Sequence, residues 1–187
     1  MMIIMAAGAI IIAMLACVMY KLFFSLEKNS KLVIHDSDHE PFVLERITND
    51  SAEFSARVGF ENLGGQYATI MDCIVRPQLP FEQYDGVDVR GKAEVDGKPR
   101  EDYYFEAVLV DPHSTLLIIM KVKLTARKGM NIREALSNMV DLPLDIIFTE
   151  LGRFPWKLKK FRIVLSAEEI AKLAGVELAG EQEEDAG

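Results

Sequence analysis

The opening residues differ from the rest of the chain in their hydrophobic pattern. Residues 2–19 read MIIMAAGAIIIAMLACVM, a continuous run of apolar or small residues without a charge. A helix needs roughly 20 such residues to cross the hydrocarbon core of a bilayer, and the run continues for a few residues past Lys21. Tyr20 and Lys21 suit the membrane interface, where an aromatic ring and a flexible ammonium both reach water. The pattern predicts a transmembrane helix over residues 1–24 and a juxtamembrane linker over 25–30.

A cleaved signal peptide is the main alternative for this segment. Such a peptide has a positively charged start, a shorter apolar run and a small-x-small cleavage site. Here no Lys or Arg precedes the apolar run, and Tyr20-Lys-Leu-Phe-Phe follows it. The stretch Met14-Leu15-Ala16-Cys17 resembles a bacterial lipobox only faintly, because a hydrophobic segment follows the cysteine. The sequence therefore favours an uncleaved anchor.

From residue 31 onward the pattern changes to short β-like runs separated by turn residues. The run 53–60 shows it best, because Phe54, Ala56, Val58 and Phe60 alternate with polar or small residues, as in a strand with one buried face. Hairpin turns are expected at Asn49-Asp50-Ser51 and at Asp96-Gly97, where the residue types tolerate positive φ. The segment 114–125 is the longest candidate, and its continuous LLIIM predicts burial on both faces. The predicted strands are 31–35, 42–48, 53–60, 67–75, 87–95, 103–110 and 114–125.

The last third of the chain mixes helical and strand patterns. Asn131 is expected to cap a helix that runs to Val140, whereas residues 141–152 contain Pro143 and an apolar LDIIF and have no assigned structure. Residues 158–165 predict a final strand. Ser166-Ala-Glu-Glu169 forms a capping box that opens a short helix through Ala174, with Gly175 as its stop.

Together these elements predict a mainly-β domain over residues 31–175, an antiparallel immunoglobulin-like β-sandwich with one or two short carboxyl-terminal helices. The Cys…Trp…Cys hallmark of true immunoglobulin domains is not in the sequence. Residues 176–187 are expected to be an acidic disordered tail, because five negative side chains occur there without a positive one: Glu177, Glu181, Glu183, Glu184 and Asp185.

One stretch of the sandwich resembles a known family. The run FSARVGFEN at 54–62 ends in Asn and is followed by the aliphatic YATIMDCIV at 67–75. Together with the single membrane helix, this resembles membrane proteins that carry a WHy-type β-sandwich of the late-embryogenesis-abundant class. Those families usually continue the Asn with Pro, where this chain has Leu63-Gly64-Gly65. The resemblance implies a binding or stress-related role without enzymatic activity, and it lends no site residues.

The charge balance isolates one basic segment. The chain of 187 residues has a net charge of −8, yet residues 153–162 hold five cations interleaved with aromatic residues. Cations and Trp are typical of contact with an anionic membrane surface, whereas the acidic net charge argues against nucleic acid. The alternative is an edge strand whose lysines discourage aggregation and whose Trp plugs the end of the sandwich. The residues assigned to possible membrane-surface contact are Arg153, Trp156, Lys157, Lys159, Lys160 and Arg162.

The sequence contains no convincing catalytic or cofactor site. The segment 35–40 (HDSDHE) is the densest group of metal-capable side chains, but consecutive extended residues point in alternate directions. The acids Glu101, Asp102 and Glu106 lack any partner arrangement that defines a mechanism. No phosphate loop, nucleophile elbow or Cys-x-x-Cys motif occurs. We therefore expect no enzyme, no cofactor and no metal, and keep a metal-dependent hydrolase that uses the 35–40 loop as an alternative.

Membrane orientation and partners follow from the anchor. Lys21, Lys28 and Lys31 against Glu27 alone favour a cytoplasmic position for the folded domain over an external one. Small residues at Ala9, Ala13 and Cys17 share one helix face and could support a homodimer. The expected function is a membrane-anchored, non-enzymatic interaction module that contacts the lipid bilayer and another membrane or envelope protein, with an envelope structural protein as a further alternative.

Overall fold

The computed structural model describes residues 2–26, 29–35, 39–99, 101–152 and 155–179. Within these ranges, the description of residues 2–7, 9, 23–26, 104 and 106 covers the backbone but not the side chains.

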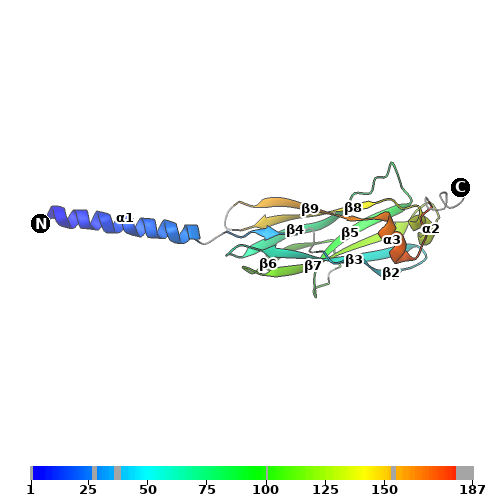
Figure 1. Ribbon diagram of the computed structural model, residues 1–187, viewed down its shortest axis with the longest axis horizontal. Coiled ribbons are helices and arrows are strands. Elements are labelled where there is room, and N and C mark those ends of the chain that lie inside the picture. Colours follow the sequence, from blue (N-terminus) through cyan, green and yellow to red (C-terminus); the bar gives the residue numbers. More distant parts are fainter. Residues whose placement is uncertain (1, 27–28, 36–38, 100, 153–154, 180–187) are drawn as a thin grey trace.

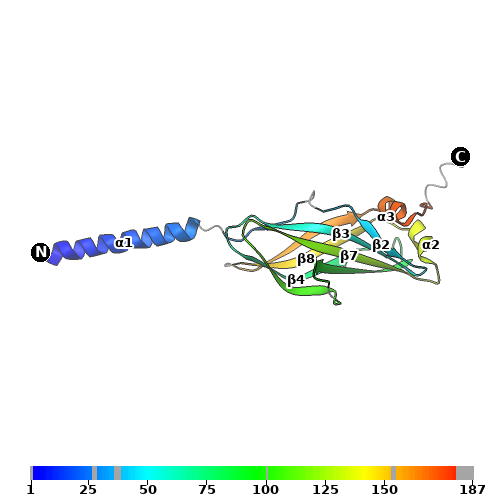
Figure 2. The ribbon, with the colours of Figure 1, turned by 90° about the horizontal axis from the view of Figure 1, so that it is seen from below.

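The opening segment forms one helix, α1 (Met2–Leu26), which ends two residues later than the predicted span. Both ribbon views show α1 extending away from one end of the sandwich (Figures 1 and 2). Among the residues whose side chains are described, which in α1 are Gly8 and 10–22, no helix is long and apolar enough to cross a membrane.

The remainder is mainly β and consists of two antiparallel sheets packed face to face, which is consistent with an immunoglobulin-like sandwich. The described residues contain nine strands, eight of which correspond to predicted runs, and the additional strand falls in the unassigned segment 141–152. The five-stranded sheet has the order β1 (Leu32–Val33), β3 (Ser51–Asn62), β7 (Thr115–Ala126) and β5 (Val87–Val95), with β2 (Val43–Ile47) also paired to β3. The four-stranded sheet has the order β6 (Tyr104–Val110), β4 (Ala68–Pro77), β8 (Leu142–Leu151) and β9 (Lys157–Leu165).

The core lies between the sheets and follows the period-two pattern of the strands. Phe54, Val58 and Phe60 of β3 are fully buried, as the alternation predicted. Phe60 meets Phe148 of the opposite sheet edge to face, with ring centroids 5.0 Å apart. The prediction that β7 is buried on both faces is wrong: its inward side chains are fully buried, but Leu117 is 39% exposed because the other face of this sheet borders solvent.

The unassigned segment 141–152 forms β8, an interior strand of the four-stranded sheet. Leu142, Leu144, Ile146 and Phe148 are buried between the sheets. Pro143 is tolerated because it lies at the beginning of the strand, where a missing backbone donor costs least.

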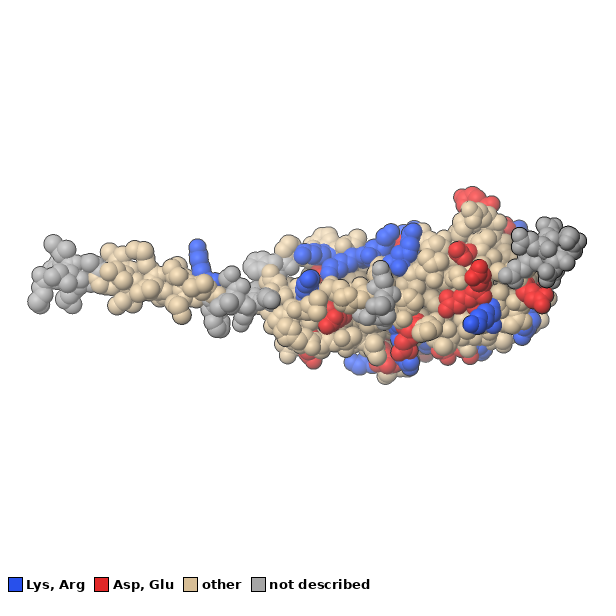
Figure 3. All heavy atoms as spheres, in the orientation of Figure 1, with Lys and Arg blue, Asp and Glu red and all other residues tan. Residues whose placement is uncertain are grey.

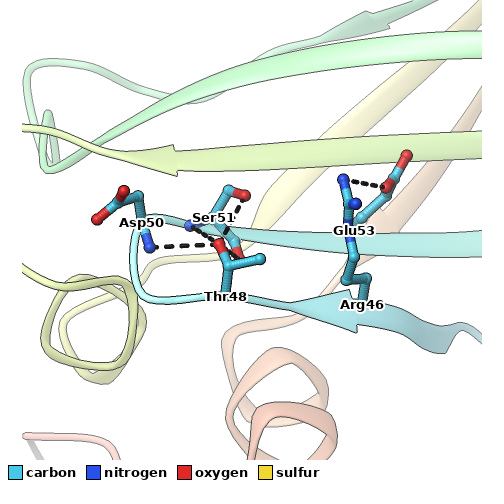
Figure 4. A network of polar contacts seen from close by, with 5 residues as sticks. All are labelled: Arg46, Thr48, Asp50, Ser51 and Glu53. Carbon is cyan, nitrogen blue, oxygen red and sulfur yellow. Dashed lines mark hydrogen bonds and ion pairs between the residues drawn. The ribbon is translucent and has the colours of Figure 1, made fainter.

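The predicted turn at Asn49-Asp50-Ser51 is confirmed and joins β2 to β3. The Thr48 backbone N–H donates to the Ser51 carbonyl at 2.8 Å, and the Thr48 hydroxyl oxygen accepts from the Asp50 and Ser51 N–H groups at 3.3 and 3.0 Å. Next to the turn, Arg46 of β2 and Glu53 of β3 form an ion pair across the two strands at 3.8 Å (Figure 4). The local polar network therefore sets the register of this hairpin.

Two short helices close the end of the sandwich opposite α1 (Figure 1). Helix α2 (Ile132–Ser137) has the predicted cap, because Asn131 accepts from the Glu134 N–H, but it ends before Val140 with Asn138 as its carboxyl-terminal cap. Helix α3 (Ala167–Ala174) begins at Ser166 and ends at Gly175, whose φ of +65° lies in the left-handed region. The expected disorder of residues 176–187 largely concerns 180–187, which lie outside the described residues.

Two buried positions mark how closely the sheets pack. A Cβ on Gly91 of β5 would lie 2.4 Å from the Val75 carbonyl oxygen of β4, so only glycine fits where these strands approach. Cys73 of β4 is fully buried, and desolvation raises the pKa of its thiol to about 12. Cys17 is exposed on α1, so the two cysteines lie in different parts of the molecule, as expected.

Candidate functional site

The chain enters the sandwich through a polar clamp centred on Asn62, the last residue of β3. Asn62 is fully buried. Its carboxamide oxygen accepts from the Lys31 and Gly64 N–H groups at 3.1 and 3.0 Å. Its amide nitrogen donates to the Gln66, Val110 and Asp111 carbonyls at 2.8, 3.2 and 3.2 Å. One side chain therefore ties the segment after α1 to the β3–β4 and β6–β7 connections at the same end of the sandwich.

A buried ion pair fixes the next residue. Glu150 of β8 accepts from the Leu32 N–H at 3.0 Å and pairs with Lys159 of β9 at 2.6 Å. The Lys159 ammonium also donates to the Leu32 carbonyl at 2.6 Å. Because both backbone groups of Leu32 are held by charged side chains, β1 is bridged to the four-stranded sheet although it pairs with β3 of the other sheet.

A second ion pair lies on the outer face of the four-stranded sheet. Arg162 of β9 donates to both carboxylate oxygens of Asp145 on β8, at 2.7 and 3.1 Å, and Lys160 lies 3.6 Å from the same carboxylate. The Arg162 hydrogen bonds and charge hold the pKa of Asp145 below its usual value, and the carboxylate raises the pKa of Arg162. This pair therefore links β8 to β9 while both groups stay ionised.

The predicted basic segment thus divides into paired and unpaired members. Lys159, Lys160 and Arg162 contact carboxylates, whereas Lys157 is exposed and has no ion-pair partner in the part of the chain that the structure describes. Trp156 is 65% exposed, so the prediction that it plugs the end of the sandwich is wrong. Arg153 lies outside the described residues.

The expected edge position of this segment is confirmed, because β9 is the last strand of its sheet. In the view of Figure 3, Lys and Arg side chains gather along one side of the sandwich toward α1, and many Asp and Glu side chains lie toward the carboxyl-terminal end. On the face seen in this view, the charge is therefore unequal along the long axis.

The outer face of the five-stranded sheet carries a different charge cluster. Glu94 of β5 is almost fully buried and pairs with Lys92 and Lys121, each at 2.6 Å. A nearby hollow of about 200 Å³ is lined by charged side chains and Tyr103. Like Asp145 and Glu150, the Glu94 carboxylate is paired with cations, so these buried acids link neighbouring strands.

The 35–40 loop does not form a metal site from its described residues. His35 pairs with Glu61 at 3.3 Å, and His39 is 3.2 Å from the Glu40 carbonyl oxygen. No group of three or more His, Cys, Asp or Glu suitable for a metal ion occurs within the described ranges. Residues 36–38 lie outside those ranges, so the metal-dependent alternative stays a prediction.

The remaining predicted positions are described only in part. Glu101 and Asp102 are exposed in a loop, and the Glu106 side chain is not among those that the structure describes. Ala13 and Cys17 are exposed along α1, whereas the side chain of Ala9 is among those not covered. The homodimer through this stripe stays a prediction.

Sequence reasoning missed the buried partners of the basic segment. Asp145 and Glu150 fall in the segment without an assigned structure, and Asn62 was noted only as the end of a strand. A usable signal was present, because a carboxylate inside the apolar run LPLDIIF requires a cation when it is buried.

The comparisons with known proteins show no family. No protein-family model matches the chain, and no curated protein matches its sequence significantly. Among solved structures, the GAE domain of GGA2p from Saccharomyces cerevisiae is similar with a TM-score of 0.35 and 11% identity, over 74% of this chain and 98% of that one. A protein from Archaeoglobus fulgidus is similar with a TM-score of 0.32 and 12% identity, over 72% of this chain and 98% of that one. Similarity at this level identifies neither a family nor a function.

Proposed function

We propose that this protein is a membrane-anchored, non-enzymatic interaction module, with α1 as an uncleaved transmembrane anchor. The observation that carries the proposal is the exposure of α1. Its consecutive Ile10, Ile11 and Ile12 point about 100° apart around a helix, and all three are more than half exposed. A helix that is apolar on all sides is unfavourable in water and suits the interior of a bilayer.

The dimensions of α1 agree with this role. A helix of 25 residues is about 37 Å long, which exceeds the roughly 30 Å thickness of a bilayer core. Tyr20 and Lys21 then fall near one interface, where both side chains reach polar surroundings. The helix is therefore long enough to span with some tilt.

We place the sandwich on the cytoplasmic side. Lys21, Lys28 and Lys31 follow the apolar run. Basic residues that flank a span are retained preferentially on the cytoplasmic side. The domain would therefore face cytoplasmic partners and the anionic inner leaflet.

A binding role is supported by how the sandwich uses its buried polar groups. Asn62, Asp145, Glu150 and Glu94 all hold strands or connections in place. A rigid scaffold with exposed loops and edges is suited to recognition. The partners that fit are the lipid bilayer and another membrane protein.

Alkaline carbonate extraction of the full chain tests the anchor. We expect the protein to remain in the membrane pellet with Met1 or Met2 as its first residue, because the apolar helix has no favourable place in water. The matched control is the double variant Ile11→Lys/Leu15→Lys, which should move to the soluble fraction. Release of the unchanged chain with soluble proteins, or a first residue after Tyr20, would disprove the anchor.

Carboxyl-terminal fusions test the orientation. In a bacterial host, a fluorescent-protein fusion should be bright and an alkaline-phosphatase fusion inactive if the sandwich is cytoplasmic. The reverse pattern would place it outside and favour an envelope role.

A further inference from the structure

The end of the sandwich from which α1 emerges carries an exposed apolar surface. We call it the proximal rim, and it consists of Leu63, Tyr67, Leu109, Leu151, Trp156 and Leu158. Four of these side chains, Tyr67, Leu109, Trp156 and Leu158, are 61–66% exposed. Large apolar side chains gathered on a surface usually mark a contact site.

The strand register brings members of the rim onto one face. Thr69 of β4 is paired with Leu109 on one side and Leu151 on the other. Leu158 of β9 is paired with Thr149, two residues from Leu151 on β8. Because side chains two residues apart point to the same face, Leu109, Leu151 and Leu158 lie together on the outer face of the four-stranded sheet.

The chain holds this rim close to α1. Lys31 and Leu32 are already fixed by Asn62 and Glu150, so the connection from Leu26 to Lys31 covers five residue steps, or at most about 18 Å. If α1 crosses a bilayer, as the proposed function holds, the rim lies next to the headgroup layer whatever direction the connection takes.

The chemistry of the rim fits that layer. Tyr and Trp combine an apolar ring with a polar tip and are enriched at membrane interfaces. Exposed Lys157 stands between Trp156 and Leu158 without an ion-pair partner in the described chain. The cations of β9 lie on this side, and many acidic side chains lie toward the opposite end (Figure 3).

We infer that the proximal rim is a lipid-contact surface whose apolar side chains enter the interfacial layer of the bilayer while Lys157 contacts anionic headgroups. The inference rests on the proposed function and deepens it. The anchor keeps the sandwich at the bilayer, and the rim sets which face the sandwich turns toward it. The opposite end, with α2 and α3, stays directed toward partners.

The only tryptophan of the chain is Trp156, so its fluorescence reports on the rim alone. The full chain is reconstituted in vesicles of phosphatidylcholine and phosphatidylglycerol that contain lipids brominated near the headgroup. We expect a blue-shifted emission that the brominated lipids quench, and loss of much of the quenching in Lys157→Glu and Leu158→Glu variants. The matched control is Trp156→Phe/Phe81→Trp, which moves the fluorophore to an exposed position far from α1 and should remain unquenched.

Carbonate extraction of the same vesicles separates the two possible failures. Unquenched Trp156 in a chain that resists extraction overturns the lipid contact and leaves the anchor standing, whereas extraction of the chain overturns the anchor itself. A blue shift that depends on protein density and not on bromine identifies contact between copies of the chain and also overturns the lipid contact.

Discussion

Asn62 is the residue whose carboxamide ties the segment after α1 to the sandwich. It donates and accepts five hydrogen bonds, and no water has access to it because it is fully buried. Buried polar groups stabilise a fold when all are paired and destabilise it when their partners are removed.

We therefore expect Asn62→Leu to lower the free energy of unfolding by about 2–4 kcal/mol, because it leaves backbone groups buried without partners. Thermal unfolding followed by circular dichroism in detergent micelles measures the change. Asn138→Leu, at an exposed helix cap, is the control and should cost no more than about 1 kcal/mol. Equal effects of the two variants would show that the clamp contributes no more than a surface residue.

Single residues also show what sequence could and could not foretell. The cationic identity of Lys159 and Arg162 was plain, and so was their place on a terminal strand. The sequence does not identify their partners Glu150 and Asp145. An ion pair between two strands depends on how the strands are aligned, and the sequence of one strand alone does not determine that alignment. The exposure of Leu109 and Leu158 depends in the same way on where the sheet ends.

At the scale of elements, alternation made β3 predictable and its absence concealed β8. A strand with one solvent-exposed face alternates apolar and polar residues, whereas an interior strand rich in apolar residues loses that alternation. In β8, Pro143 also resembles the end of an element. The sandwich class could therefore be predicted, but the central strand of one sheet and the shortened α2 could not.

The pairing of β8 with β9 should depend on pH through Asp145. The folded-state pKa of Asp145 lies below the unfolded value of about 3.9, so its ionisation stabilises the fold above that pH and the contribution is lost as pH falls through the lower, folded value. We expect Asp145→Asn to lower the unfolding temperature by a few degrees at pH 7 and to have little effect near pH 2.

Unfolding temperatures across this range measure that dependence. The control is Asp88→Asn. Asp88 forms an ion pair with Arg90 at 3.3 Å, but both side chains are more than half exposed, and such a pair contributes little to stability. A constant difference between the Asp145 variant and the unchanged protein from pH 7 to 2 would refute the role of Asp145 ionisation.

At the scale of the whole molecule, the two ends have different surroundings. Helix α1 lies at one end of the sandwich, and α2, α3 and the described carboxyl-terminal residues lie at the other (Figures 1 and 2). If α1 spans a bilayer as proposed, the short connection between α1 and β1 makes contact of the rim with lipid an intramolecular event, so the strength of that contact depends on tether length.

Insertion of about fifteen Gly and Ser residues after Lys28 should lower the effective concentration of the rim at the bilayer about eightfold, since it falls with the −3/2 power of tether length. Quenching of Trp156 by brominated lipids should weaken accordingly, while circular dichroism stays unchanged. The same insert fused after Gly187 is the control and should leave the quenching as it was. An insertion after Lys28 that changes nothing would mean the rim binds lipid without help from the anchor, or not at all.

The burial of Cys73 has a practical consequence for following α1. Only the thiolate reacts with alkylating reagents, and a thiol with a pKa of about 12 that is closed to solvent is inert near neutrality. Cys17 is exposed on α1 and is then the sulfhydryl open to maleimides while α1 is outside a bilayer, whereas the hydrocarbon core excludes its thiolate once α1 inserts. The loss of maleimide labelling at Cys17 therefore reports insertion of α1, free of background from the sandwich.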